Sequence, residues 1–351
     1  MDVPERRQKQ NFKTHQNLIV ERLTLPEEKK SKFVKIINSI KMSIYILYLI
    51  FKKRYELIIV TSMPPVISAF TVMIACRIKK IRFIYYCMDI YPEVGKISGD
   101  FKNKIIYKSL LHVDSKTCLY ANPVLVHSQD MLKTLSARPQ GHKFNIKTLN
   151  NFYKNPIGSS DDYKFDVQYN NSKLTVVYAG NLGRFQNLNL MLDIIHKVDS
   201  SKIEFVFVGD GVMRQHLINR AQIENIDVTF LGHKSPQKVK KYIKEADICL
   251  ITLDKGVINC AYPSKTMAYL AQGKPLLALV ENNCELASMI VRRRIGFILD
   301  ADNLRSCTEL LHNISIDKEW IMDANVNAKK AFYELFSDHK ILKKWDLILK
   351  Y

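Results

Sequence analysis

The sequence of 351 residues lacks several features that would assign it to a familiar class. Its seven cysteines include no CxxC pair and no framework spacing, which favours separate thiols in a reducing compartment. The first twenty residues are polar and basic, so no signal peptide is visible. There is no GxGxxG and no P-loop, so neither nicotinamide nor ATP binding is implied. No His/Cys cluster has ligand spacing, and we expect no metal and no cofactor.

No apolar run is long enough to span a bilayer. The apolar stretch 33–55 is interrupted by Lys35 and Lys41, and its uninterrupted part, Met42 to Phe51, is shorter than the roughly 20 residues required. Two interpretations remain open. The stretch is either a buried domain helix with a solvated charged end, or a helix that lies on a membrane surface with basic flanks.

Acidic residues are scarce in the first half of the chain. Residues 1–150 contain 11 Asp and Glu against 26 Lys and Arg, whereas residues 151–351 contain 23 against 27. This asymmetry predicts an anionic partner for the first half alone. We favour an anionic membrane surface over nucleic acid, because no aromatic-basic interleaving and no known nucleic-acid reader motif is present.

The chain alternates strand-like and helix-like runs, which is typical of α/β layering. Several predicted strands end in a glycine or polar turn, as in doubly wound parallel sheets with a ligand crevice at the carboxyl ends of the strands. We therefore predict two such domains and a cleft between them. The boundaries are 1–150 for the first domain, 151–172 for a linker, 173–335 for the second domain and 336–351 for a C-terminal helix that packs back on the first.

Two segments of the second half carry the chemistry. "AGNLGRF" (179–185) places Gly180, Gly183 and Arg184 at a strand-to-helix turn, where backbone N–H groups and an arginine can hold a phosphate. "YPSKTMAYLAQGKPLLALVE" (262–281) predicts a helix with Ser264 as N-cap and Lys265 in its first turn. A cation is unfavourable at that end of a helix dipole, so an anion is expected beside it.

These segments, with "FVFVGDGVMRQHL" and "VTFLGHKSPQKVKKYIKEADICLITLDKG", occur in the order seen in the retaining glycosyltransferases of family 4. The resemblance is strong over 173–300 and moderate over 56–155, through "TSMPP", "DIYPE" and "VHSQDMLKTL". It is closest in character to the subgroup that builds bacterial O-antigen, capsule or colanic acid. The resemblance implies the GT-B fold.

The resemblance also implies a set of site residues. The donor diphosphate would be held by the glycine turn and the lysine, the base by the turns after two later strands, and the sugar by the loop "ENNCE" (281–285). The donor-binding residues expected on this basis are Gly180, Asn181, Gly183, Arg184, Gly209, Gly211, Gly232, Ser264, Lys265, Asn282 and Glu285. Such enzymes work without a metal, because Arg, Lys and the helix dipole meet the diphosphate charge.

Asp89 is the catalytic candidate. It ends the predicted strand 82–89 and begins "DIYPE", which resembles the subgroup's Asp–apolar–aromatic–Pro–Glu loop. Its expected role is to assist an acceptor hydroxyl or to stabilise positive charge on the donor sugar. The alternative is an aspartate that only caps the next loop.

The chain departs from the family pattern at several positions. The paired glutamates of many members fall at Cys260 and Ala268, neither of which can bind a hydroxyl as a carboxylate would. Met88 stands where the subgroup often has arginine. Residues 1–17 supply neither the opening strand nor the glycine-rich turn of the first domain, so either the fold starts one strand late or the true start lies upstream.

The expected function is transfer of a sugar, with retention, from a nucleotide diphosphate sugar to a lipid-linked acceptor in surface-polysaccharide synthesis. UDP is the expected nucleotide, and the expected location is the inner face of the plasma membrane. Two rivals remain open. One is a degenerate GT-B scaffold or partner subunit without activity, favoured by Ala268, and the other is a nucleotide-sugar epimerase.

Overall fold

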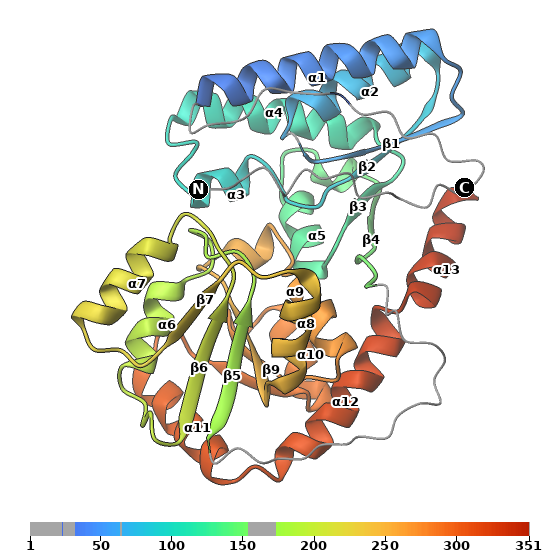
Figure 1. The fold of residues 1–351 in the computed structure, drawn as a ribbon. Coiled ribbons are helices and arrows are strands. Elements are labelled where there is room, and N and C mark those ends of the chain that lie inside the picture. Colours follow the sequence, from blue (N-terminus) through green and yellow to red (C-terminus); the bar gives the residue numbers. More distant parts are fainter. Residues whose placement is uncertain (1–22, 24–31, 64, 154–172, 351) are drawn as a thin grey trace.

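The computed structural model describes residues 23, 32–63, 65–153 and 173–350. The expectations for residues 1–17 and for most of the linker, 154–172, lie outside the described residues. Two parallel sheets form the centres of two domains, one above the other in Figure 1.

The first domain is built on a four-stranded parallel sheet in the order β1-β2-β3-β4. Helices α2 and α4 pack on one face of the sheet, and α1 packs on α2. Figure 1 shows these three helices running across the end of the molecule that lies farthest from the second domain. The elements are α1 (Lys32–Lys52), β1 (Leu57–Thr61), α2 (Ile67–Lys79), β2 (Arg82–Tyr86), α3 (Glu93–Ile97), α4 (Lys104–Tyr120), β3 (Val124–Val126), α5 (Gln129–Ser136) and β4 (Ile146–Thr148).

The second domain has a six-stranded parallel sheet in the order β10-β9-β8-β5-β6-β7. The strand order reverses beside β5, and the crevice above such a reversal is where doubly wound sheets bind ligands. The elements are β5 (Leu174–Ala179), α6 (Leu188–Ile195), β6 (Ile203–Val208), α7 (Arg214–Ile223), β7 (Thr229–Gly232), α8 (Pro236–Glu245), β8 (Ile248–Thr252), α9 (Lys265–Ala271), β9 (Leu276–Leu279), α10 (Glu285–Arg293), β10 (Gly296–Leu299) and α11 (Leu304–Ile316).

The last two helices connect the domains. Helix α12 (Trp320–Leu335) packs on α9, and α13 (Asp338–Leu349) then lies against the first sheet. Ile341 and Ile348 of α13 are buried against Ile84 and Leu125 of the first sheet. Arg82 of β2 donates hydrogen bonds to the carbonyls at the end of α13, at 3.0 Å for Leu349. Burial of apolar area on both sheets makes this crossing a stabilising contact between the domains.

The alternating pattern predicted most of these elements because continuous apolar runs become the buried strands of parallel sheets. Four details differ. Strand β4 and the short helix α3 were not expected, and β2 ends at Tyr86 rather than at residue 89. Ser264 does precede α9, but its side chain makes no capping hydrogen bond and its backbone is already helical.

Most of the apolar stretch 33–55, up to Lys52, lies in α1. Its inner side packs on α2, where the Ser43 and Ser68 hydroxyls lie 3.0 Å apart. Its other side is exposed. Of the helices in the described part of the chain, none combines the length and the apolarity needed to cross a membrane.

Candidate active site

A cavity of about 650 Å³ lies between the two domains. The first domain contributes the loop that follows β2, and the second contributes the turn after β5 and the start of α9. The short segment that leaves the first domain supplies the rest of the wall. Among its lining residues are Asp89, Tyr91, Asn151, Tyr153, Gly180, Asn181, Ser264, Lys265 and Ala268. The structure therefore brings the catalytic candidate and the central donor-binding candidates to one cavity.

A second cavity of about 450 Å³ adjoins the first, and Tyr153, Gly180, Asn181 and Ala268 line both. It extends over the turn after β6 to the loop after β7, where Gly209 and His233 line it. The two adjoining cavities together follow the carboxyl ends of β5, β6 and β7. This shape suits an elongated ligand with a flat group at one end.

Lys265 is the central cation of the first cavity. Its Nζ lies 3.6 Å from the centroid of the Tyr178 ring, and within the described residues it has neither a hydrogen bond nor an ion pair. Burial lowers the pKa of Lys265 to about 7. Its position at the first residue of α9 adds the positive end of the helix dipole. A cation in this setting is strongly stabilised by an incoming anion.

The glycines in the turns after β5 and β6 are required by close packing of the backbone as well as by the expected ligand binding. Gly180 has a φ of +156°, and a Cβ there would lie 3.2 Å from Nζ of Lys265. A Cβ on Gly209 would lie 1.8 Å from the carbonyl oxygen of Gly180. Only glycine lets the turns after β5 and β6 approach so closely. Gly211 is equally constrained, by the carbonyl of Leu182 at 2.3 Å.

Several expected donor-binding residues lie away from the two cavities. Arg184 is exposed and lines neither cavity. The residues Gly183, Gly211, Gly232 and Asn282 line neither of these two cavities either. The lysine and the Gly180 turn are therefore the part of the expected phosphate clamp that the structure assembles.

Glu285 lies at an interdomain contact rather than in the first cavity. It is the first residue of α10, and its carboxylate accepts the backbone N–H of Gln129, the first residue of α5. The N–H of Glu285 donates in return to the Asp130 carboxylate at 2.7 Å. Each helix N-terminus is thus capped by an acid from the other domain.

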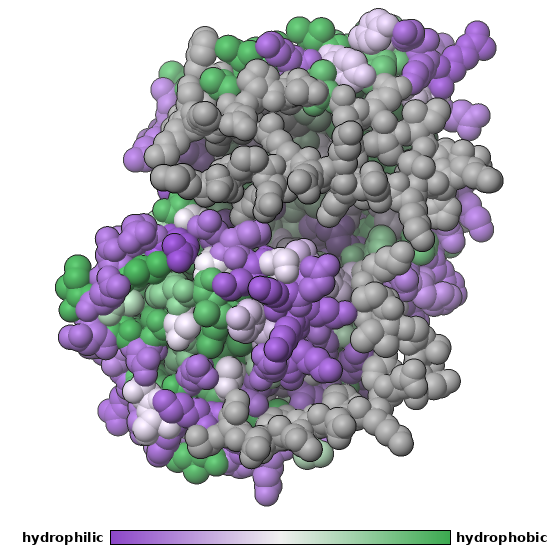
Figure 2. Space-filling model, in the orientation of Figure 1, coloured by the Kyte–Doolittle hydropathy of each residue, from purple (hydrophilic) through white to green (hydrophobic). Residues whose placement is uncertain are grey.

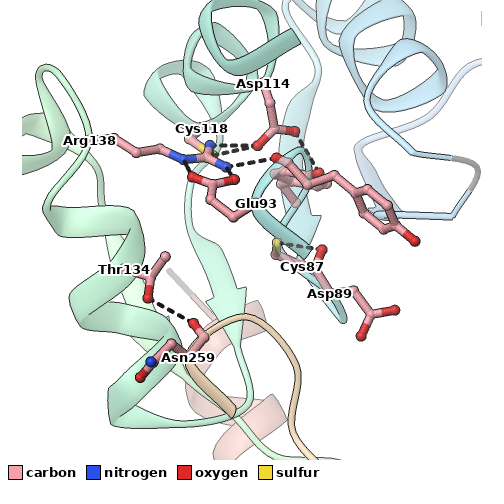
Figure 3. A network of polar contacts seen from close by, with 10 residues as sticks. Cys87, Asp89, Glu93, Asp114, Cys118, Thr134, Arg138 and Asn259 are labelled. Atoms are coloured by element: carbon pink, nitrogen blue, oxygen red, sulfur yellow. Dashed lines mark hydrogen bonds and ion pairs between the residues drawn. The ribbon is translucent and has the colours of Figure 1, made fainter. Parts of the chain in front are cut away.

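Asp89 lies in the loop after β2, directly against the second domain. Its N–H donates to the Ser62 hydroxyl at 3.1 Å, and its backbone forms an isolated antiparallel bridge with Ala261. In the described structure no hydrogen bond or ion pair holds its carboxylate, which Figure 3 shows pointing away from the neighbouring polar network. Burial raises the pKa of the Asp89 carboxyl above its ordinary value.

The positions of the two family glutamates have different surroundings. Ala268 lines both cavities and faces the ligand side, as its spacing from Lys265 predicts. Cys260 is 4% exposed and packs into the core of the first domain, beside Ile90 and Val94. Burial raises the pKa of the Cys260 thiol to about 12. An apolar contact therefore replaces a ligand-binding carboxylate at this position.

Sequence reasoning missed the aromatic wall of the first cavity. Tyr91, Phe152, Tyr153, Phe185 and Tyr262 all line it. Phe152 and Tyr153 come from the stretch interpreted as the start of a polar linker. Two adjacent aromatic residues in such a stretch were the signal that could have found them, because flat aromatic faces suit the rings of bases and sugars.

Comparison with known families agrees with this geometry. Residues 159–331 match the sequence model of the family described as Glycosyl transferases group 1. Nearly half of the chain therefore has the sequence pattern of a group 1 glycosyltransferase domain. The family expected from the motifs is therefore confirmed.

Three curated relatives come from bacteria. The chain is 24% identical over 221 residues to the probable glycosyltransferase WbjE of Pseudomonas aeruginosa, a match that covers 62% of the chain and 55% of WbjE. It is 32% identical over 106 residues, 29% of each protein, to an N-acetyl-D-galactosaminyltransferase of Campylobacter jejuni that is named for an undecaprenol-linked acceptor. The putative colanic acid glycosyl transferase WcaI of Escherichia coli is 24% identical over 34% of the chain and 29% of WcaI. The chain thus matches about half or less of the length of these relatives.

Solved structures confirm the expected two-domain fold. Anabaena HepE in complex with UDP superposes with a TM-score of 0.66 at 16% identity, covering 90% of this chain and 84% of HepE. Sucrose-phosphate synthase of Thermosynechococcus elongatus gives a TM-score of 0.70 at 14% identity, covering 93% and 80%. At these identities the similarity concerns the GT-B architecture.

Proposed function

We propose that this protein is a group 1 glycosyltransferase that transfers a sugar from a UDP-linked donor to a lipid-linked acceptor, with retention, in the synthesis of a bacterial surface polysaccharide. The observation that carries the proposal is Lys265, which has no hydrogen bond or ion pair among the described residues and lies beside the Gly180 turn in a cavity between the domains. The UDP in the HepE structure and the bacterial relatives, one of which is named for colanic acid biosynthesis, support the choice of donor and pathway class.

Each wall of the cavity has a proposed role. The Lys265 ammonium and the Gly180 and Asn181 backbone hold the donor diphosphate and stabilise the negative charge that grows on it as the sugar leaves. The continuation past Gly209 and His233 receives the base. Asp89, from the first domain, faces the opposite side and assists the acceptor hydroxyl or stabilises positive charge on the sugar. The first domain is then the acceptor side.

Calorimetric titration with UDP, GDP and ADP, without added metal, tests the donor assignment. Wild type is expected to bind UDP, and Lys265→Met to bind it more weakly by about 1.5–3 kcal/mol, the usual range for a charged hydrogen bond. The matched control is Lys274→Met, because Lys274 is also a half-buried lysine but donates to the carbonyl of Ala246 outside both cavities. UDP binding that Lys265→Met leaves unchanged would contradict the proposed clamp.

The same titration separates the transferase from its rival. If wild type binds none of the three nucleotides, the transferase proposal fails and a non-catalytic scaffold explains the sequence better, in line with Ala268. If UDP binds, transfer of labelled sugar from UDP-sugars into a butanol-soluble lipid fraction of bacterial membranes tests the acceptor. Label that stays in water-soluble products would contradict a lipid-linked acceptor.

We further propose that the first domain contacts an anionic membrane surface through α1 and α2. Along α1, the exposed residues Ile40, Ile44 and Phe51 recur at helical spacing, with Ile44 61% exposed. On α2, Ile78 is 65% exposed. At this end of the molecule Figure 2 shows hydrophobic residues side by side with hydrophilic ones. Apolar side chains among lysines suit insertion between anionic headgroups.

The charge of this end supports an anionic partner. Helices α1, α2 and α4 together contain nine Lys or Arg residues and a single acid, Asp114. Asp114 is fully buried and paired with Arg138, so it does not offset the positive surface. Each lysine near an anionic surface contributes about 1 kcal/mol of attraction.

Co-sedimentation with vesicles tests this surface. Wild type is expected to bind vesicles that contain phosphatidylglycerol but not vesicles of pure phosphatidylcholine. Added salt should release it from the anionic vesicles. Ile44→Glu should weaken binding, whereas Ile223→Glu, a change at a similarly exposed position on α7 of the second domain, should not. Equal binding by both variants would contradict the assignment of the surface to α1.

A further inference from the structure

Arg138 lies two residues beyond the end of α5, and its guanidinium donates hydrogen bonds to two carboxylates and a backbone carbonyl. It is 6% exposed. Its guanidinium donates to both oxygens of Glu93, at 2.8 and 2.7 Å, and to the carboxylate of Asp114 at 2.6 Å. A further N–H donates to the backbone carbonyl of Tyr91 at 2.7 Å. Figure 3 shows the fork of Arg138 on Glu93 and the bond to Asp114, which we call the Arg138 cluster.

The Arg138 cluster ties together separate parts of the first domain. Asp114 comes from the middle of α4 and also accepts the hydroxyl of Tyr85 in β2 at 2.8 Å. Glu93 is the first residue of α3. Buried charges of this kind stabilise a fold no better than apolar side chains of similar volume, but they impose a specific geometry. The geometry imposed here is that of the loop 89–93.

The loop 89–93 is held at both ends. At its start the Ser62 hydroxyl accepts the N–H groups of Met88 and Asp89, each at 3.1 Å. At its end the Arg138 cluster holds the Tyr91 carbonyl and the Glu93 carboxylate. Between these ends the N–H of Ile90 donates to the carbonyl of Cys260 in the second domain at 2.8 Å.

Asp89 and Tyr91 are the cavity-lining residues of this loop. The Asp89 carboxylate has no hydrogen bond of its own in the described structure, so its direction depends on the backbone that carries it. The carbonyl of Tyr91, two residues later, is bound directly by Arg138. A shift of the cluster would therefore move both side chains relative to Lys265 on the opposite wall.

We propose that Arg138, with Glu93 and Asp114, is a positioning residue that aims Asp89 and Tyr91 into the interdomain cavity. This assignment rests on the transferase function proposed above, because Asp89 is its catalytic candidate. Arg138 does not reach the cavity itself. A lysine cannot replace it, since an ammonium lacks the planar fork that serves two carboxylates and a carbonyl at once.

Two variants test the proposal, Arg138→Lys and the milder Glu93→Gln, which keeps the size of the side chain. The first measurement is hydrogen exchange of the full chain, read on peptides that cover residues 86–98. Both variants should exchange faster there, above all at the Ile90 amide, while peptides over α9 should exchange as in wild type. The matched control is Arg220→Lys, because Arg220 also binds two carboxylates, Asp193 and Glu224, and a carbonyl, that of Asn189, but lines neither cavity.

The second measurement is hydrolysis of UDP-glucose, UDP-galactose, UDP-N-acetylglucosamine and UDP-N-acetylgalactosamine with water as acceptor. For the donor that wild type turns over, kcat should fall on the order of 100-fold in Arg138→Lys, the typical cost of misplacing a catalytic group by about 1 Å. The KM should stay within about twofold, because Lys265 and the Gly180 turn are untouched. Arg220→Lys should change neither constant.

The outcomes separate this inference from the proposed function. Unchanged hydrogen exchange over residues 86–98 in both variants would overturn the positioning role. A change of kcat and KM by similar factors, accompanied by faster hydrogen exchange throughout the protein, would overturn it as well. If wild type neither binds UDP nor hydrolyses any of the four donors, the transferase proposal fails. In that case the exchange measurement alone still decides whether Arg138 holds the loop 89–93.

Discussion

Glu285 and Gln129 join the two domains head to head, because the carboxylate at the start of α10 accepts the first backbone N–H of α5. Asp130 returns the contact by accepting the N–H of Glu285. Two helix N-termini that face each other would otherwise leave unsatisfied N–H groups and two positive dipole ends in contact. Glu285 and Asp130 each accept an N–H group at the start of the other domain's helix and offset its positive dipole end. These N–H groups therefore have these partners only when the two domains are in contact.

Removal of this cap should loosen the domain contact. Glu285→Ala is expected to lower the free energy of unfolding by about 1–2 kcal/mol, the usual cost of losing a helix cap, and to increase the radius of gyration. Glu285→Gln keeps an acceptor oxygen and should lose less. Urea unfolding and X-ray scattering measure the two effects. Glu334→Ala, which removes an exposed partner of Arg293, is the control and should change little. An unaltered radius of gyration in Glu285→Ala would contradict a role in holding the domains together.

The affinity for UDP should depend on pH through Lys265. Its pKa is lowered by burial to about 7 in the empty site, and a bound diphosphate favours the charged form and raises it. Binding therefore takes up a proton. Affinity should fall as the pH rises from 7 to 9, a window that lies above the range in which a phosphate group of the ligand titrates.

Calorimetry in buffers of different ionisation enthalpy measures this proton uptake directly. Lys265→Met should show weaker binding that is independent of pH over the same window. Proton uptake that persists in Lys265→Met would assign the titration to another group.

Gly209 should tolerate no side chain. Gly209→Ala places a Cβ 1.8 Å from the Gly180 carbonyl oxygen, so the turns after β5 and β6 must separate. We expect a loss of about 3 kcal/mol, at the upper end of overpacking costs, together with weaker UDP binding. Gly232→Ala is the comparison, because its Cβ would first meet Arg214 at 3.4 Å and only the positive φ of 67° is costly, by about 1 kcal/mol. Urea unfolding compares the two. Equal losses would show that backbone strain alone, without the close approach, explains Gly209.

Restoring the family glutamate at position 260 should destabilise this protein. Cys260→Glu buries a carboxyl beside Ile90 and Val94 and near the acids Glu93 and Asp89. The nearby Arg138 is already bound by Glu93 and Asp114, so the change should cost about 3 kcal/mol or more at neutral pH. The raised pKa of the Cys260 thiol already indicates how unfavourable a charge is there. Cys260→Ser, with its smaller polar group, should cost about 1 kcal/mol.

Thermal or urea unfolding checks both variants of Cys260. The loss in Cys260→Glu should shrink as the pH is lowered, since the carboxyl then folds in its neutral form. A stable Cys260→Glu protein would show that position 260 opens to the ligand side after all.

The sequence predicted the second domain better than the first. Its strands are continuous apolar runs followed by glycine turns, and both features are local, so the pattern alone could place the Gly180 turn and Lys265 on one crevice. The first domain carries weaker signals: β3 and β4 are three residues each, and α1 reads equally well as core or surface.

The candidate site was predicted only in part for the same reason. Lys265, Gly180, Asn181 and Asp89 share a cavity, whereas Arg184 and Glu285, which sit beside these motifs in the sequence, point elsewhere. Local spacing says which residues share a turn. It does not say which way a side chain leaves that turn.

The amino-acid sequence by itself therefore determined the α/β class and indicated the family and the lysine–glycine half of the candidate site, because periodicity and turn chemistry act over a few residues. Only the tertiary structure decided how the first domain and the domain contact contribute to the candidate site. The cap between α5 and α10, the burial of Cys260 in the opposite domain and the hold of Arg138 on the loop 89–93 all join residues that are distant in the chain. The first two contacts form only when the two domains pack together, whereas the contacts of Arg138 form when α3, α4 and the segment after α5 assemble on the first sheet. In both cases the burial of apolar area brings the distant segments together.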